Sequence, residues 1–131
     1  MSGGQAGASV GKSPVGFDNP IKTGAFGQGI DDAMVKGGDL QTGDVYLLEY
    51  KGGKARLAKG QMELEWVVGN IKRLYHEGGP SGKQWALVFA KALNEGRLKG
   101  EAWSTRIIGG KPQPAFMIKD WNYGKLTIKL P

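Results

Sequence analysis

The chain begins its regular patterning with two segments typical of β-strands. Residues 30–36 predict a strand, residues 36–43, which include three glycines, predict a turn, and residues 44–51 predict a second strand, so this part of the chain predicts a hairpin. Because side chains alternate along a strand, the odd-numbered residues from Val45 to Lys51 share one face. Both faces of this strand are largely apolar, which predicts that it is central in its sheet.

Two longer segments follow with helical periodicity. Residues 61–77 and 83–98 repeat apolar side chains every three or four positions, and each predicts an amphipathic helix. Strand patterning then returns in three segments, at residues 102–108, 115–119 and 125–130. Two strands, two helices and three strands predict an α/β or α+β fold around a mixed sheet.

The first 14 residues differ from the rest of the chain. Gly, Ser, Ala and Gln dominate residues 1–14, which hold too few large apolar side chains to offset the entropy lost on ordering, so they predict a flexible leader or linker. The remaining residues, 15–131, predict one domain, because a chain of 131 residues rarely holds a second core. No apolar run is long enough to span a bilayer, and residues 1–14 lack the apolar core of a secretory signal.

Composition excludes several kinds of catalytic site. The chain has no cysteine and one histidine, His76, which rules out thiol catalysis, Cys/His zinc sites and acid–base catalysis by two histidines. The net charge is +6, but residues 1–50 carry six acidic residues and three lysines, whereas residues 51–131 carry fifteen basic and six acidic residues. A region that can hold a cation beside one that can hold phosphates suits a metal-dependent enzyme acting on nucleic acid. An uneven but merely solvated surface is the alternative.

The candidate chemistry centres on Glu49 and Lys51, near the end of the predicted central strand. Two residues apart, they project from the same face, and a charge on an apolar face is costly unless it is paired or binds a metal. They could form a purely structural ion pair. Alternatively, Glu49 ligates a hard cation such as Mg²⁺, while Lys51 positions the attacking water and neutralises charge on a phosphate.

Further candidates lie on either side of this strand. Asp31 or Asp32, brought beside Glu49 by the hairpin, could supply a second carboxylate, although an Asp-Asp pair could equally open a strand at the surface. Gln61 is predicted at the start of the first helix, where anions are favoured, and its amide could contact a phosphate or a water on the metal.

These residues, in this order, resemble the PD-(D/E)XK nuclease superfamily. The closer similarity is to the restriction-endonuclease-like toxin domains at the C-termini of bacterial polymorphic and contact-dependent growth inhibition toxins. It covers roughly residues 24–76 and rests on Gly29-Ile30-Asp31, Leu48-Glu49-Tyr50-Lys51-Gly52, Lys59-Gly60-Gln61-Met62 and Trp66. Ile30 replaces the proline that commonly precedes the aspartate, and no glutamate precedes Glu49 to match the extra helical carboxylate of some members.

The resemblance implies a restriction-endonuclease-like mixed sheet flanked by helices, and a metal-dependent endonuclease. Asp31 and Glu49 would ligate Mg²⁺, Mn²⁺ or Zn²⁺, with Asp32 as the alternative ligand, while Lys51 would be the catalytic lysine and Gln61 an auxiliary residue. The substrate would be DNA, with tRNA as the alternative. It also implies a cognate immunity protein, and a larger secreted or surface-delivered toxin that acts in the cytoplasm of the target cell.

Several basic residues follow the candidate site along the chain. They could contact phosphates or serve only as solubilising charges: Lys54, Arg56, Lys59, Lys72 and Arg73. Two other classes of function stay open at this point. One is a non-catalytic nucleic-acid-binding module in which Glu49 and Lys51 form a structural pair, and the other is an interaction protein whose basic face binds an acidic partner.

Overall fold

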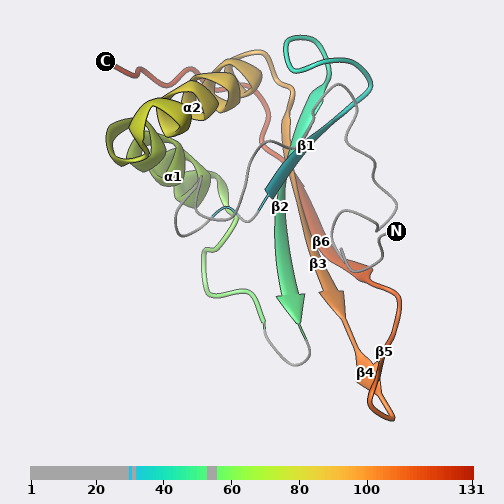
Figure 1. The fold of residues 1–131 in the computed structure, drawn as a ribbon. Helices are drawn as coiled ribbons and strands as arrows, with labels where there is room; N and C mark the ends of the chain where they lie inside the picture. The colour runs from blue at the N-terminus through green and yellow to red at the C-terminus, as the bar shows by residue number, and fades with distance from the viewer. Residues whose placement is uncertain (1–29, 31, 53–55) are drawn as a thin grey trace.

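A four-stranded mixed sheet forms the centre of the computed structural model, which describes residues 30, 32–52 and 56–131 (Figure 1). The sheet order is β1-β2-β3-β6. β1 and β2 form an antiparallel hairpin, β3 runs parallel to β2 after two helices, and β6 is antiparallel to β3. The elements in chain order are β1 (Asp32–Lys36), β2 (Asp44–Gly52), α1 (Leu64–Glu77), α2 (Gly79–Asn94), β3 (Leu98–Thr105), β4 (Ile107–Ile108), β5 (Lys111–Pro112) and β6 (Phe116–Asn122).

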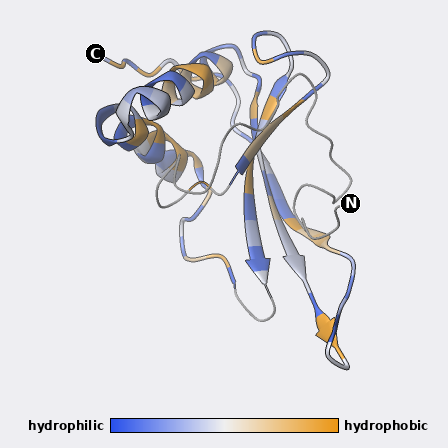
Figure 2. Cartoon of the chain, in the orientation of Figure 1, coloured by the Kyte–Doolittle hydropathy of each residue, from blue (hydrophilic) through white to orange (hydrophobic). Residues whose placement is uncertain are grey.

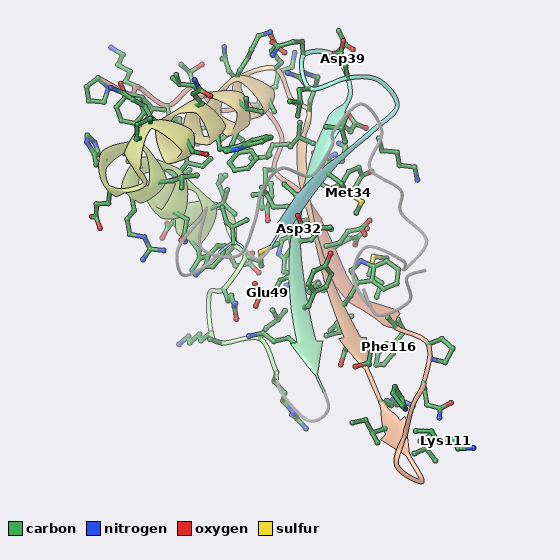
Figure 3. All side chains as sticks on the ribbon, in the orientation of Figure 1. Asp32, Met34, Asp39, Glu49, Lys111 and Phe116 are labelled. Atoms are coloured by element: carbon green, nitrogen blue, oxygen red, sulfur yellow. The ribbon has the colours of Figure 1, made fainter. Side chains whose placement is uncertain are left out.

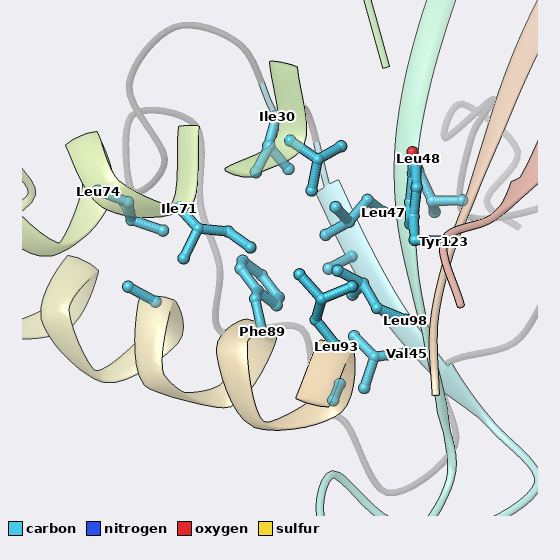
Figure 4. Close-up of a cluster of buried hydrophobic side chains, with 14 of the residues drawn as sticks. Ile30, Val45, Leu47, Leu48, Ile71, Leu74, Phe89, Leu93, Leu98 and Tyr123 are labelled. Carbon is cyan, nitrogen blue, oxygen red and sulfur yellow. The ribbon is translucent and has the colours of Figure 1, made fainter. Parts of the chain in front are cut away.

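Both helices lie on one side of the sheet, and the core fills the space between them and the strands (Figures 1 and 4). Phe89 of α2 points from the helices toward the sheet, where Val45 and Leu47 of β2 project from the face that the sequence predicts for odd-numbered residues. All three side chains are at most 1% exposed. Figure 2 shows hydrophilic residues on the outer sides of the helices, as amphipathic helices require.

The structure confirms a mixed sheet with two helices and revises several boundaries. The second helix begins at Gly79, four residues before its predicted start, since Pro80 is tolerated in a first helical turn. It ends at Asn94 because Gly96 adopts a φ of 78°, a left-handed conformation that terminates helices. Leu98, predicted as the last helical residue, is instead the first residue of β3. Leu98 lies at a position that fits the helical repeat of apolar residues, but Gly96 ends the helix before it.

The predicted strand over residues 125–130 is wrong. These residues form no strand and pass along α2, where Leu126 N–H donates to Leu93 O at 3.1 Å and Thr127 Oγ1 lies 2.6 Å from Asn94 Oδ1. Ile128 and Leu130 pack against the core from this extended segment. Its alternating apolar residues therefore bury one side against a helix and need no partner strand.

Two further expectations concern the ends and the surroundings of the domain. The predicted leader, residues 1–14, lies outside the described residues, and the domain boundary at residue 15 stays a prediction. Within the described ranges, neither helix is long and apolar enough to cross a bilayer.

Candidate functional site

Glu49 and Lys51 lie in the second half of β2, the end that extends beyond the two helices in Figure 1; Figure 3 labels Glu49 there. Lys51 Nζ is 3.2 Å from Glu49 Oε2, and the exposed fractions of the two side chains are 20% and 6%, respectively. The ion pair shows that both side chains project to the same side of the strand. Glu49 is thus a largely buried carboxylate whose cationic partner reaches solvent.

Asp32 is not brought to Glu49 by the hairpin. Its register partner is Leu48, and cross-strand partners share a face, so Asp32 lies on the face opposite Glu49. Its Oδ1 accepts a hydrogen bond of 2.8 Å from the N–H of Ala33, next in the chain. Asp32 therefore loses its geometric support as the alternative ligand. Asp31 lies outside the described residues, so its place in the site stays a prediction.

Gln61 does not stand at the start of α1, which begins three residues later at Leu64. It lies in a turn before the helix, where its Oε1 accepts a hydrogen bond of 3.0 Å from Ala58 N–H and its own N–H donates to Ala58 O at 3.0 Å. The amide oxygen therefore closes the loop between β2 and α1. Residue 63, rather than 61, holds the cap position of the helix, with no side-chain cap.

This loop is anchored on the sheet through Met62. Met62 is fully buried with a φ of 70°, and its carbonyl accepts a hydrogen bond of 2.7 Å from the hydroxyl of Tyr123. Both side chains pack over Gly100 of β3, where an added Cβ would meet Tyr123 Oη at 2.5 Å and Met62 Cε at 3.0 Å. Glycine at position 100 thus permits the loop to approach the sheet. Burial raises the pKa of Tyr123, so its hydroxyl stays protonated and available as a donor.

Replacing Tyr123 with phenylalanine should lower the free energy of unfolding by about 1–3 kcal/mol. The buried Met62 carbonyl would lose its hydrogen bond while the aromatic ring stays in place. Urea denaturation followed by circular dichroism measures the change. Tyr75→Phe is the matched control, because the Tyr75 hydroxyl bonds to the Pro131 carbonyl at an exposed position. Equal destabilisation by both variants would contradict a special role for the Tyr123–Met62 contact.

A second anchor joins the same loop to the edge strand β6. Glu63 Oε2 accepts hydrogen bonds from Lys119 Nζ at 3.0 Å and from Trp121 Nε1 at 3.1 Å, and the Lys119 ammonium lies 5.1 Å from the centre of the Trp121 ring. The hydrogen bond from Trp121, and in second place the hydrogen bond from Lys119, lowers the pKa of the Glu63 carboxyl. Glu63 is therefore ionised at neutral pH and holds both side chains.

The strand register places Lys119 on the same face as Glu49. Glu49 pairs with Ala102 of β3, and Ala102 pairs with Lys119 of β6, so one row crosses three strands. In the adjoining row Lys51 pairs with Ser104, which is 7% exposed. With strands about 4.8 Å apart, the Cα atoms of Glu49 and Lys119 are about 10 Å apart. Sequence reasoning missed Lys119 because only the parallel β2–β3 pairing brings it into this row.

The basic residues predicted to contact phosphates differ in how close they lie to the candidate site. Arg56 and Lys59 are exposed in the loop that leaves β2, on the side of the candidate site, whereas Lys54 lies outside the described residues. Lys72 and Arg73 are exposed on α1 and lie about 12–14 Å further along the helix axis than its first residue. The structure therefore does not gather these two with Glu49.

The chemistry of the donors favours a hard cation. Carboxylate oxygen is the ligand that Mg²⁺ and Mn²⁺ prefer, and Glu49 offers one beside an ionic partner. His76, the nitrogen ligand that Zn²⁺ would favour, lies in the last turn of α1, away from β2. Among residues 30, 32–52 and 56–131, no group of three or more His, Asp or Glu side chains could hold a metal. A metal site at Glu49 would need a further carboxylate, and Asp31 is the candidate that the sequence predicts.

Comparison with protein-family models, curated proteins and solved structures found no match for the chain.

Proposed function

We propose that the chain is a metal-dependent endonuclease with a restriction-endonuclease-like fold. The observation that carries the proposal is the Glu49–Lys51 pair, a buried carboxylate and a partly exposed lysine 3.2 Å apart near the end of a central strand that extends beyond both helices. A buried ion pair contributes little net stability over an apolar pair, so its presence beside a lysine that reaches solvent favours a chemical role. The mixed sheet with helices on one face is compatible with the proposed fold.

Each residue of the pair has a distinct role in the proposal. Glu49, together with Asp31, would hold a divalent cation; when bound, such a cation polarises the phosphate and lowers the pKa of an attacking water. Lys51 donates hydrogen bonds to a phosphate oxygen and offsets the negative charge that develops during hydrolysis. The ion pair keeps the Lys51 ammonium beside the Glu49 carboxylate, on the same face of β2. The role of Asp31 rests on the sequence resemblance.

Substrate and biological setting are proposed from the resemblance. We infer DNA as the substrate, with tRNA as the alternative within the same chemistry. The domain would be the toxic part of a larger secreted or surface-delivered protein, neutralised by an immunity protein and active in the cytoplasm of the target cell. The exposed Arg56 and Lys59, near the end of β2, provide positive charge for a polyanionic substrate.

The test compares wild type with Lys51→Ala on plasmid DNA and on total tRNA, with Mg²⁺, Mn²⁺ or Zn²⁺ and with chelator. We expect the wild type to cleave one of the two substrates, and to do so only when metal is present. Lys51→Ala should cleave that substrate more slowly by about 100-fold or more. Lys36→Ala, at an exposed position at the other end of the hairpin, is the control and should keep full activity.

The rival function is a non-catalytic nucleic-acid-binding module, which the ion pair itself also fits. It predicts binding that weakens with salt, is unaffected by chelator and is unaccompanied by cleavage. If folded wild type binds nucleic acid but cleaves neither substrate with any of the three metals, the nuclease proposal is wrong and the binding module is favoured.

A further inference from the structure

Lys119 is an unusually constrained lysine for an edge strand. Its ammonium contacts the Glu63 carboxylate at 3.0 Å and lies over the Trp121 ring, yet the side chain is 52% exposed. Exposed lysines ordinarily sample many rotamers, and fixing one costs side-chain entropy. The Glu63 carboxylate and the Trp121 ring both favour this one placement of the ammonium.

The position of this charge relates it to the candidate site. Lys119 shares a face and a register row with Glu49, and the residue between them, Ala102, has a side chain of a single carbon. Ala102 is fully buried, so the row is covered between them, and solvent reaches the two ends through the Lys51 and Lys119 side chains. Lys51 and Lys119 thus place two positive charges on one face, on either side of β3.

The Lys119 ammonium can serve a ligand while it contacts Glu63. An ammonium has three donors, and Glu63 Oε2 accepts one of them. The same oxygen also accepts from Trp121, which shares its negative charge between two donors. A half-exposed ammonium held in this way can bind a phosphate oxygen as a point charge.

We propose that Lys119 binds a phosphate of the substrate that flanks the scissile one, positioned by Glu63 and Trp121. The strand being cut would run across β2, β3 and β6 from Lys51 to Lys119, the two cations of this face that reach solvent, and would pass above the buried Ala102 between them. This inference rests on the proposed nuclease function and adds the path of the substrate to it. The rival explanation is that the Glu63–Lys119–Trp121 contacts only brace the loop.

The two explanations differ in the salt dependence of binding. We compare Lys119→Gln with Glu63→Gln, and use Lys129→Gln, an exposed lysine on the C-terminal segment, as the control. The dissociation constant for the cleaved nucleic acid is measured in chelator over a series of salt concentrations. Loss of one phosphate contact should reduce the slope of log K against log salt by about 0.9 for duplex DNA or about 0.7 for a single strand. We expect that loss in Lys119→Gln, whereas Glu63→Gln should keep the slope because its amide oxygen can still accept the hydrogen bond from Lys119.

A second measurement locates the contact on the substrate. Oligonucleotides with one neutral methylphosphonate at each position near the cleaved bond should bind wild type less tightly when the neutral group lies at one flanking position. Lys119→Gln should be insensitive at that position, because its contact is already lost. Lys129→Gln should retain the wild-type pattern.

The outcomes separate this inference from the proposed function. If wild type cleaves with metal but Lys119→Gln has the wild-type salt slope and methylphosphonate pattern, the subsite is wrong and the nuclease stands. If Lys119→Gln and Glu63→Gln both lower stability and neither changes the slope, the contacts are only a brace. If folded wild type neither binds nor cleaves nucleic acid, both proposals are wrong.

Discussion

Replacing Glu49 with glutamine is expected to slow metal-dependent cleavage by about 100- to 1,000-fold, the scale seen when one group that stabilises a transition state is removed. Glutamine has the size of glutamate, and its amide oxygen can still accept a hydrogen bond from Lys51, so the fold should be retained. It lacks the negative charge that makes a carboxylate a much stronger ligand than an amide for a divalent cation. Cleavage rates at saturating metal, with circular dichroism to verify folding, measure the effect.

Glu101→Gln is a closely matched control for this variant. Glu101 is also a buried glutamate, 6% exposed, on the strand next to β2. Its register partner is Leu48, so it projects from the face opposite Glu49, where its Oε1 accepts a 2.8 Å hydrogen bond from Trp103 Nε1. We expect near wild-type activity. Equal losses in the two variants, or full activity in Glu49→Gln, would contradict the assignment of Glu49.

Replacing Phe89 with alanine is expected to lower the free energy of unfolding by about 3–5 kcal/mol. Phe89 is fully buried between the helices and the sheet, with Ile71 and Leu93 among its neighbours in the core cluster and the Trp85 ring centre 6.0 Å away (Figure 4). Truncation would leave a cavity where the two layers meet. Because domains of this size are stable by about 5–15 kcal/mol, the loss is a large fraction of the total.

Leu87→Ala provides the comparison for Phe89, since Leu87 lies on the same helix but is 50% exposed. A surface substitution of this kind should change stability by about 0.5 kcal/mol or less. Urea denaturation of both variants measures the difference. If Phe89→Ala were no more destabilising than Leu87→Ala, that result would contradict the packing of Phe89 between α2 and the sheet.

The sequence was most informative where a pattern is local. Alternation along residues 44–51 predicted that Glu49 and Lys51 share a face, and the 3.2 Å ion pair confirms that they do. The face of Asp32 relative to Glu49 depends on the β1–β2 register, and only the structure, which pairs Asp32 with Leu48, places it on the opposite face. Local patterns therefore identified the centre of the candidate site but not which aspartate lies beside it.

Other features depend on tertiary packing that no local pattern contains. The apolar alternation near Ile128 suits a strand, but the segment packs on α2 instead. Gln61 fits a helix start by type, yet it bonds to Ala58 in a turn, and the next residue, Met62, is held by the hydroxyl of Tyr123, which follows β6. Lys119 joins the candidate site only through the register of three strands. Long-range pairing decided each of these positions.

The most direct test of the central claim is cleavage by wild type and Glu49→Gln, assayed side by side on plasmid DNA and total tRNA as divalent metal is raised from zero. The account predicts that wild type cleaves one of them at a rate that rises with metal and returns to zero with chelator, while folded Glu49→Gln stays at least about 100-fold slower. Cleavage that persists in chelator, or none by folded wild type with Mg²⁺, Mn²⁺ or Zn²⁺, would contradict it.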